Sequence, residues 1–499
     1  MSKQNIGLIG LAVMGENLAL NIESRGYSVA VYNRTAIKTK NFIESKAKNK
    51  KFIGTYSFKE LVDLLEKPRK IILMIKAGKP VDDNIENLMP LLDKGDLIID
   101  GGNSFFKDTI RRCEELENKG ILYIGTGISG GEEGALKGPS IMPGGKAEAY
   151  KMVEKIFKDI AAKAEDGIPC VDWIGPTGAG HFVKMVHNGI EYGDIQLIGE
   201  CVWALKNVLG LSSDKISDIM ALWNGTSDVL RSYLIEITGQ GLREKIKGSG
   251  KYLVDQTADI TRMKGTGVWT IQSALELLIP IPTIAAAVFS REMSEDKDLR
   301  LKISEKMKIG FEKHSSIGIA ANKFVDIAHD ALYIAKISSY AQGFALLSRA
   351  SDFYKFNLDL AKIARCWRAG CIIRAQFLNE INSEYIKNPD VASLILLSEF
   401  SDFIRNNLHK LAKFISIAHS FGVPVLAMTS AYDYILQLSS SVMVSAQVAA
   451  QQRDFFGAHG YFKLEGNSPK IFTNADGKQI EFHTEWMLTG HPEIELEKK

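Results

Sequence analysis

Short apolar runs alternate with helical stretches through the first 175 of the chain's 499 residues. The runs that predict strands cover residues 5–9, 28–32, 70–75, 96–100 and 121–125, and glycines or capping residues separate them. Because strands that alternate with helices usually form parallel βαβ units, we predict a doubly wound α/β sheet for this part of the chain.

The pattern changes near the segment GPTGAG at residues 175–180. From there to about residue 440 almost every stretch is patterned as an amphipathic helix. The last 60 residues carry turn signals at Gly466-Asn467 and Asp476-Gly477, and too few apolar residues for a core of their own. We predict three parts: an α/β domain at 1–177, a large all-α domain at 178–440 and an irregular C-terminal tail at 441–499.

One predicted helix near the start of the all-α domain carries an unusual polar stripe. Its members, spaced i, i+3, i+4, i+7 and i+8, are Lys184, His187, Asn188, Glu191 and Tyr192. They share an arc of roughly 140° and offer five different proton donors or acceptors, whereas a solvated helix face usually carries loose Lys–Glu pairs. Gly189 and Gly193 lower the helix propensity with no benefit to a surface. The stripe therefore predicts the wall of a polar pocket.

Composition and charge narrow the class of protein. A hydrophobic content of 45% with 24% charged residues is ordinary for a soluble globular protein. A net charge of +2 argues against a general attraction to nucleic acid or to an anionic membrane. The N-terminus leads almost directly into an apolar strand, and the apolar runs fall short of the roughly 20 residues of a membrane span. Five cysteines without CxxC or metal spacing predict reduced thiols, a cytoplasmic location and no metal.

The first predicted strand leads into a dinucleotide-binding fingerprint, Gly10-x-Ala12-x-x-Gly15. Small residues at these positions let backbone N–H groups approach a pyrophosphate at the N-terminus of the following helix. The turn expected to bind the cofactor consists of Gly10, Leu11, Ala12, Val13, Met14 and Gly15. Such turns also occur without ligands, but the position in the first βαβ unit favours a Rossmann-like domain.

The end of the second predicted strand discriminates between cofactors. NAD-binding sheets usually have a carboxylate there for the ribose 2′-hydroxyl, whereas this chain has Asn33, Arg34 and Thr35. An Arg flanked by an amide and a hydroxyl suits the 2′-phosphate of NADP. The alternative is an ordinary turn with an exposed Arg.

Several further segments supply groups that could meet the polar stripe. Asn103 follows a predicted strand, where open α/β sheets bind ligands, and the turn Ser129-Gly130-Gly131 could hold a carboxylate through backbone N–H groups or be a flexible loop. The other candidates are Lys264, Thr266, Arg291, Arg453 and His459. Each basic residue alone is more often a solvated side chain, but together they could bind a dianionic phosphate.

Eight segments occur in the order of one family. They are GLIGLAVMG, NRT, IKAG, DGGNS, SGGEEGALKGPSIMPGG, GAGHFVKMVHNGIEYGD, KGTGVWT and QRDFFGAH, and over essentially the whole chain they resemble the decarboxylating 6-phosphogluconate dehydrogenases. Arg262, Val268 and Lys137 depart from the usual family pattern, and none is a residue to which we assign chemistry.

The resemblance implies a reaction of the pentose phosphate pathway. NADP would oxidise 6-phosphogluconate at C3, the 3-keto acid would lose carbon dioxide, and the enediol would be protonated to ribulose 5-phosphate. Lys184 is our candidate base for the C3 hydroxyl and would then polarise the ketone, so that no metal is needed. Glu191, two turns along the helix, is the candidate acid for C1.

The remaining roles also follow from the resemblance. His187 and Asn188 would orient substrate oxygens, and Asn103 would lie near both cofactor and substrate. The segment IKAG adds Ile75, Lys76 and Ala77 to the cofactor site, and Ser129, Gly130, Gly131 and Thr266 belong to the substrate site. Tyr192, Lys264, Arg291 and Arg453 would hold the phosphate. The family's tail reaches into the partner subunit of a homodimer, which would place Arg453 and His459 in trans.

Two alternatives stay open at this level. One is another 3-hydroxyacid dehydrogenase, a group that shares the fingerprint, the SGG turn and a lysine on the long helix but is typically shorter. The other is a non-catalytic NADP-binding regulator on the same fold.

Overall fold

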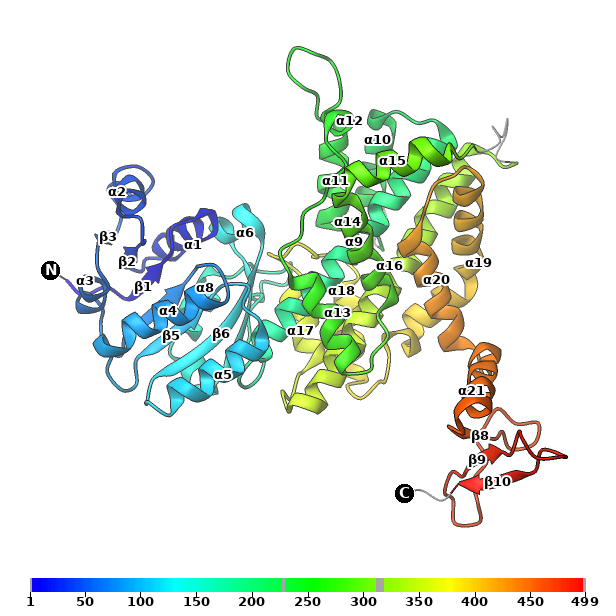
Figure 1. Ribbon diagram of the computed structural model, residues 1–499. Helices are drawn as coiled ribbons and strands as arrows, with labels where there is room; N and C mark the ends of the chain where they lie inside the picture. Colours follow the sequence, from blue (N-terminus) through cyan, green and yellow to red (C-terminus); the bar gives the residue numbers. More distant parts are fainter. Residues whose placement is uncertain (1, 227–228, 311–317, 497–499) are drawn as a thin grey trace. The chain divides into compact units, whose positions relative to one another are not determined.

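The computed structural model describes residues 2–226, 229–310 and 318–496. The chain separates into two compact units, Met1–Tyr432 and Asp433–Lys499 (Figure 1). The first unit contains both the sheet and most of the helices, and the second contains the C-terminal segment. The predicted boundary near residue 177 falls inside the first unit and stays a prediction.

A seven-stranded sheet opens the first unit, in the order β3-β2-β1-β4-β5-β6-β7. The strands are β1 (Ile6–Ile9), β2 (Val29–Tyr32), β3 (Phe52–Thr55), β4 (Lys70–Leu73), β5 (Leu97–Asp100), β6 (Leu122–Ser129) and β7 (Ser140–Gly145). β1 to β6 pair in parallel, which confirms the doubly wound α/β prediction.

Two strands were not predicted, and one breaks the parallel pattern. β7 was not among the predicted strands, and it pairs antiparallel with β6 at the edge of the sheet. The sequence of β7, SIMPGG, hides it because proline and glycine are poor strand formers and occur mainly at sheet edges. β3 was missed because it follows a lysine-rich stretch, which hides the short apolar run in the sequence.

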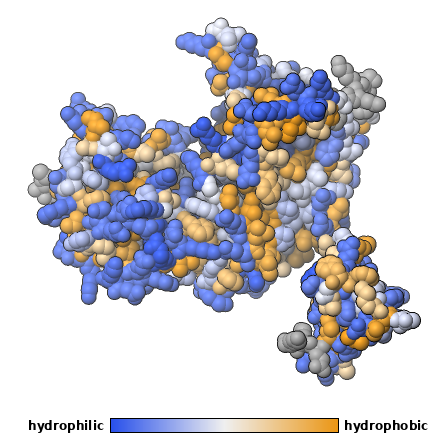
Figure 2. All heavy atoms as spheres, viewed as in Figure 1, coloured by the Kyte–Doolittle hydropathy of each residue, from blue (hydrophilic) through white to orange (hydrophobic). Residues whose placement is uncertain are grey.

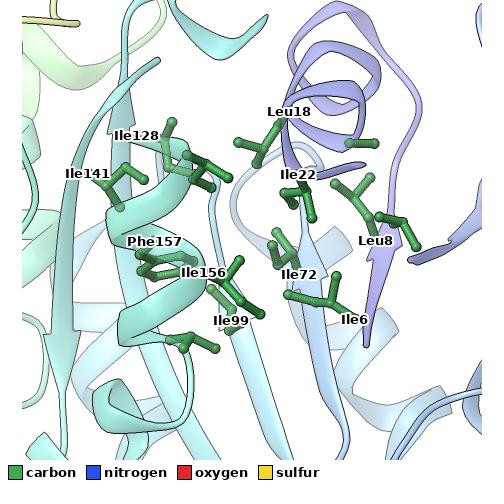
Figure 3. Close-up of a cluster of buried hydrophobic side chains, with 14 of the residues drawn as sticks. Ile6, Leu8, Leu18, Ile22, Ile72, Ile99, Ile128, Ile141, Ile156 and Phe157 are labelled. Carbon is green, nitrogen blue, oxygen red and sulfur yellow. The ribbon is translucent and has the colours of Figure 1, made fainter. Parts of the chain in front are cut away.

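Helices cover both faces of the sheet. They are α1 (Val13–Ser24), α2 (Ala36–Glu44), α3 (Phe58–Asp63), α4 (Lys79–Leu88), α5 (Phe106–Glu117), α6 (Gly131–Lys137), α7 (Ala147–Lys151) and α8 (Glu154–Ile160). Alternate residues of each strand point to opposite faces. Leu8 joins a core with Leu18 of α1 and Phe157 of α8 (Figure 3), whereas Ile9 joins a second core with Val81 of α4 and Leu116 of α5.

The rest of the first unit is helical, as predicted. Its helices are α9 (Ala179–Leu209), α10 (Ser213–Thr226), α11 (Tyr233–Arg243), α12 (Leu253–Gln256), α13 (Thr266–Glu276), α14 (Pro282–Glu295), α15 (Lys297–Met307), α16 (Ala321–Tyr354), α17 (Leu360–Trp367), α18 (Leu378–Lys387) and α19 (Ser398–Ser420). The next helix, α20 (Leu426–Ser439), begins in the first unit and ends in the second. The long helix α9 packs against β6, β7, α13, α14 and α16. No helix of the described residues is both long enough and apolar enough to cross a membrane.

The second unit is built around one buried carboxylate. It contains α21 (Val444–Gly457) and an antiparallel sheet of β8 (Tyr461–Phe462), β9 (Glu481–Thr484) and β10 (Glu493–Leu496), so the tail is more regular than predicted. Asp454 accepts hydrogen bonds from Gly460 N at 3.0 Å and from the indole of Trp486 at 2.9 Å, and the imidazole of His483 lies 2.7 Å away. Of the described residues 441–496, Phe482 is the only hydrophobic one that is buried, which agrees with the low apolar content of this segment.

Candidate active site

A cavity of about 780 Å³ lies where the parallel strands β1, β2, β4 and β5 end. Its lining includes nine of the residues predicted to contact the cofactor: Gly10, Ala12, Met14, Asn33, Arg34, Thr35, Ile75, Lys76 and Asn103. Leu11, Val13, Gly15 and Ala77 are predicted residues outside the lining. A site at the carboxyl ends of parallel strands is where doubly wound sheets bind nucleotides.

The glycines of the fingerprint are required by close backbone contacts. Gly10 has φ +105°, and a Cβ there would lie 2.4 Å from the carbonyl oxygen of Met74. A Cβ at Gly15 would lie 1.9 Å from the carbonyl oxygen of Gly10, so only glycine lets α1 start this close to the strand. The Asn33 side chain accepts a hydrogen bond from Leu11 N at 3.0 Å, which joins the turn to the end of β2.

Two cations at the end of β2 suit a phosphate group. Arg34 and Lys38 both line the cavity, and neither has an acidic partner within the part of the chain that the structure describes. Two unpaired cations fit the 2′-phosphate of NADP better than the 2′-hydroxyl of NAD. Lys38 was missed in the sequence, although its spacing of four residues from Arg34 at the start of a predicted helix was a usable signal. Asn84 and Asn87, on one face of α4, were also missed.

Lys184 is buried, with 6% of its surface exposed, and its partners are neutral. Its Nζ donates to Asn188 Oδ1 at 2.5 Å and lies 3.3 Å from His187 Nδ1. No carboxylate pairs with Lys184 among the described residues. Burial lowers the pKa of Lys184, and the charge of Glu191 only partly opposes that shift. The structure thus holds an amine that can be neutral closer to physiological pH than a solvated lysine.

His187 connects the stripe to the sheet. Its Nε2 lies 3.2 Å from the hydroxyl oxygen of Ser129, the last residue of β6, and its ring meets the edge of Trp367 at a centroid distance of 5.5 Å. Burial and the nearby Lys184 hold the pKa of His187 well below its usual value. The imidazole is therefore neutral at pH 7 and serves as a hydrogen-bonding group.

Glu191 has the opposite shift from Lys184. Burial raises the pKa of Glu191, and Lys184 and Arg291 partly counteract the effect. Its Oε2 lies 3.8 Å from His187 Nδ1, and 23% of the side chain is exposed. One face of α9 thus carries an amine with a lowered pKa and a carboxyl group with a raised pKa, shifts that suit a base and an acid.

The far end of the stripe meets α13 and α14. The guanidinium of Arg291 stacks on the ring of Tyr192, with Cζ 3.7 Å from the ring centroid. The Thr266 hydroxyl accepts a hydrogen bond from Asn188 Nδ2 at 3.3 Å. Lys264 is exposed just before α13 and reaches no partner among the described residues. These side chains could hold an anionic group at this end.

Two of the positions that depart from the resembled pattern have a visible environment. Val268 packs beside Tyr192 and Val288, and Lys137 forms a surface ion pair with Glu133 at 2.7 Å. Arg262 is exposed. Within the described residues, no hydrogen bond or ion pair joins any of the three to Lys184 or Glu191.

The glycines of α9 allow close packing, which explains their presence in a helix. A Cβ at Gly189 would lie 2.7 Å from Thr270 Cγ2 of α13, and a Cβ at Gly193 would lie 2.3 Å from Ser339 Oγ of α16. On the sheet side, a Cβ at Gly127 would lie 2.3 Å from Lys184 Cβ. The loss of helix propensity thus accompanies a tightly held backbone.

The turn at the end of β6 is packed rather than free. Ser129 is buried, and a Cβ at Gly130 would lie 2.5 Å from the carbonyl oxygen of Gly370. Gly131 has φ +62° and begins α6. The flexible-loop alternative therefore does not describe this turn. Gly370 and Trp367 come from a distant segment, and no pattern in the sequence predicts that this segment lies here.

A second buried lysine lies on α16 and pairs with an aspartate of α9. Lys336 of α16 is fully buried, and its Nζ donates to Asp194 Oδ2 of α9 at 2.7 Å. The Tyr340 hydroxyl donates to the same oxygen at 3.2 Å. This ion pair was missed because 142 residues separate its members in the sequence.

Arg453 and His459 belong to the second compact unit. Arg453 lies on α21, His459 follows that helix, and both are exposed. The stripe of α9 belongs to the first unit, and the role of Arg453 and His459 stays a prediction.

Across residues 2–226, 229–310 and 318–496, no group of three or more His, Cys, Asp or Glu side chains could hold a metal ion. The five cysteines, all within this part of the chain, are free and buried.

Known proteins are similar to this chain over almost its whole length. Residues 5–175 match the NAD binding domain of 6-phosphogluconate dehydrogenase, and residues 180–486 match the 6-phosphogluconate dehydrogenase C-terminal domain. The Bacillus subtilis (strain 168) NADP(+)-dependent, decarboxylating 6-phosphogluconate dehydrogenase is 49% identical over 98% of this chain and 100% of its own length. The decarboxylating enzyme of Escherichia coli (strain K12) is 48% identical over 98% and 100%.

A solved structure agrees. Plasmodium falciparum 6-phosphogluconate dehydrogenase, described in its apo form and in complexes with its cofactor NADP+ and its substrate 6-phosphogluconate, has a TM-score of 0.88. It is 41% identical, and the likeness covers 94% of this chain and 100% of that one.

Proposed function

The chain belongs to the decarboxylating 6-phosphogluconate dehydrogenases, and we propose that Lys184 and Glu191 carry the two proton transfers of its reaction. The reaction converts 6-phosphogluconate and NADP to ribulose 5-phosphate, carbon dioxide and NADPH. The observation that supports the assignment is the pairing, on one helix, of a lysine with a lowered pKa and a glutamate with a raised pKa. The likeness over the whole chain sets aside the two alternatives raised by the sequence.

Lys184 acts first in this proposal. As the hydride leaves C3, the neutral amine accepts the proton of the C3 hydroxyl, and bound NADP supplies the hydride acceptor. The resulting ammonium donates a hydrogen bond to the new ketone and stabilises the enolate as carbon dioxide departs. Asn188, which accepts from Lys184 Nζ, keeps the amine oriented, and neutral His187 holds a substrate hydroxyl.

Glu191 acts last. The enediol needs a proton at C1, and a carboxyl group with a raised pKa keeps its proton to a higher pH than a solvated glutamate does. Asn103, on the cofactor cavity, contacts both ligands, and the Ser129-Gly130-Gly131 turn and Thr266 contact the sugar acid. Tyr192, Arg291 and Lys264 bind the phosphate, an anion that the stacked guanidinium and the exposed ammonium attract.

We propose that a homodimer completes the phosphate site, with Arg453 and His459 acting at the active site of the partner subunit. The support is the surface of the tail. Phe455 is 55% exposed, Phe456 71% and Met487 82%, and Figure 2 shows hydrophobic atoms on this unit. Apolar side chains exposed in such numbers suit contact with another chain of the same sequence. The five free cysteines support a cytoplasmic location.

The division of labour on α9 has a direct test. Glu191→Gln keeps the size and a hydrogen bond but removes the transferable proton. In rapid mixing with 6-phosphogluconate, this variant should form one equivalent of NADPH at near the normal rate and then turn over slowly. Solvent deuterium uptake at C1 of ribulose 5-phosphate should report the slow step. If the first hydride transfer is as slow as in Lys184→Met, Glu191 would only tune the lysine.

The tail proposal has its own test. Arg453→Ala chains and Lys184→Ala chains are each expected to be inactive, and hybrid dimers would contain one site with both residues intact. Mixing under conditions of subunit exchange should recover up to about half of the activity per hybrid. Verified hybrids without activity would place Arg453 at its own subunit's site or at none.

A further inference from the structure

Asp100 is a buried carboxylate at the end of β5 that the proposed reaction does not use. Its side chain is fully buried, and both oxygens are engaged. Oδ1 accepts a hydrogen bond from Gly102 N at 3.1 Å, and Oδ2 accepts from the hydroxyl of Ser104 at 2.6 Å. The Tyr123 hydroxyl of β6 donates to the same Oδ2 at 2.9 Å.

These bonds clamp the turn on both sides of Asn103. Asn103 is exposed to the cofactor cavity, and within the described residues no hydrogen bond holds its own side chain. Its direction therefore depends on the backbone between Gly102 and Ser104. The hydrogen bonds that Asp100 accepts from Gly102 N and from the Ser104 hydroxyl hold that backbone in place.

Asp100 also connects to the loop that leads into α4. The guanidinium of Arg112 lies between them, with Nη1 3.6 Å from Asp100 Oδ2, and Nε and Nη2 bonded to Asp82 at 2.8 and 3.0 Å. Arg112 Nη2 donates to Gly78 O at 3.1 Å as well. Asp82 lies in the first turn of α4, the helix whose Asn84 and Asn87 line the cavity.

A third connection reaches α9. His181 Nε2 lies 3.1 Å from the carbonyl oxygen of Asp100, and its Nδ1 lies 2.7 Å from the Thr109 hydroxyl. Burial lowers the pKa of His181, so the ring is neutral and can donate from Nε2 while it accepts at Nδ1. His181 lies one helical turn before Lys184. One buried residue thus joins the two loops at the cofactor cavity to the helix with the catalytic lysine.

We propose that Asp100 is a positioning residue that sets the direction of Asn103 toward cofactor and substrate through the Gly102 and Ser104 hydrogen bonds. The inference rests on the proposed function, because it gives Asn103 a contact with both ligands. Asp100 does not touch the reacting atoms. It contributes by keeping one conformation of the turn, so that binding does not have to order it.

The test is a double-mutant cycle that avoids replacing a buried charge. Ser104→Ala removes one clamp bond, Asn103→Ala removes the side chain that the clamp directs, and the double variant combines them. Ser104→Ala should lower kcat/KM for NADP by about tenfold, because binding then has to order the Asn103 side chain. In the Asn103→Ala background the same change should have almost no further effect, because there is nothing left to direct.

Thr55→Val is the matched control. The Thr55 hydroxyl is buried in the same sheet and donates to Val31 O at 3.0 Å, but it does not line the cavity. This variant should lower Tm about as much as Ser104→Ala and leave kcat/KM unchanged. Tyr123→Phe, which removes the other hydroxyl from Asp100 Oδ2, should repeat the result for Ser104→Ala.

Two results would overturn the inference. One is full additivity of Ser104→Ala and Asn103→Ala, and the other is an equal loss of kcat/KM in Thr55→Val. The same cycle run on NADPH affinity, by fluorescence titration, needs no turnover. A wild-type chain that forms no NADPH from 6-phosphogluconate would contradict the proposed function, whereas additive NADPH affinities would contradict the clamp alone.

Discussion

Of two buried lysines, Lys184 lies on helix α9 and Lys336 of α16 packs against that helix, and their partners differ. Lys336 is bonded to the carboxylate of Asp194, with a tyrosine hydroxyl on the same oxygen. Lys184 is bonded to the carboxamide of Asn188 and lies beside a neutral imidazole. Burial penalises both ammonium groups, but only Lys336 receives a full compensating charge.

The difference separates a structural lysine from one that can exchange a proton. The Lys336 ammonium lies 2.7 Å from a carboxylate oxygen of Asp194, and this buried ion pair is a structural contact between α16 and α9. A neutral partner orients the amine and leaves the pKa lowered by burial. The proton transfer that we propose for Lys184 thus depends on its neutral partner, just as the structural role of Lys336 depends on the carboxylate of Asp194.

Removal of Lys184 should have the largest effect. Lys184→Met should reduce the rate of NADPH formation by about 10²- to 10⁴-fold, because no group takes the C3 hydroxyl proton. NADPH affinity, measured by fluorescence, should be unchanged. Lys206→Met is the matched control, since Lys206 lies on the same helix, paired with Asp255 at 2.6 Å and half exposed. A rate within tenfold of the wild type would remove Lys184 from the base role.

Removal of Lys336 should act on stability instead. Lys336→Met leaves Asp194 buried without its charge partner, which should lower the free energy of unfolding by about 3–5 kcal/mol. The double variant Lys336→Met/Asp194→Leu should recover most of that loss, because neither charge is then left buried. Chemical denaturation of the three chains measures both effects. A single variant as stable as the wild type would show that the pair is not the structural element we describe.

A carboxylate can be given to Lys184 to make it resemble Lys336. In Asn188→Asp, the new charge lies where Asn188 Oδ1 accepts from Lys184, and it should raise the pKa of Lys184. The base needs the neutral amine, so the acid limb of the kcat/KM profile should move to higher pH. Asn188→Ala removes the same hydrogen bond without adding charge and should not produce that upward shift.

The smallest effect concerns stability and pH. The pKa of Lys184 is lowered in the folded chain, whereas a lysine in the unfolded chain has a pKa of about 10.4. At pH values below the folded-state pKa, folding of the wild type buries the charged ammonium of Lys184, which costs free energy. Lys184→Met removes this cost and should therefore have a larger free energy of unfolding than the wild type. The gain should shrink as pH rises from the folded pKa toward that of the unfolded chain. A variant less stable than the wild type at pH 7 would contradict an uncompensated ammonium.

The sequence predicted one of these lysines and not the other for a physical reason. Lys184, His187 and Asn188 are neighbours along one helix, and helical spacing alone brings them together. Lys336 and Asp194 meet only through tertiary packing, and nothing in either segment marks the partner. The doubly wound sheet and the helical region were predicted on the same local grounds, whereas β7 was hidden by its proline and glycines.

The same limit applies to the rest of the site. Gly189 and Gly193 were recognisable as anomalies, but Thr270 and Ser339, which explain them, come from distant helices. Asp454 organises the tail, yet in the sequence it is one acidic residue beside the candidate Arg453.

The contact between α9 and the sheet has a mechanical consequence. A Cβ at Gly144 would lie 2.2 Å from Gly180 N, and a Cβ at Gly180 would lie 2.3 Å from Met142 O, so helix and strands touch backbone to backbone. Such a contact has no side-chain layer that could slide or be compressed. This contact holds α9 rigidly against the sheet and cannot act as a hinge. The span from the nucleotide-binding strands to Lys184 is therefore constant, and any closing motion around the substrate has to come from the loops and side chains at the rim.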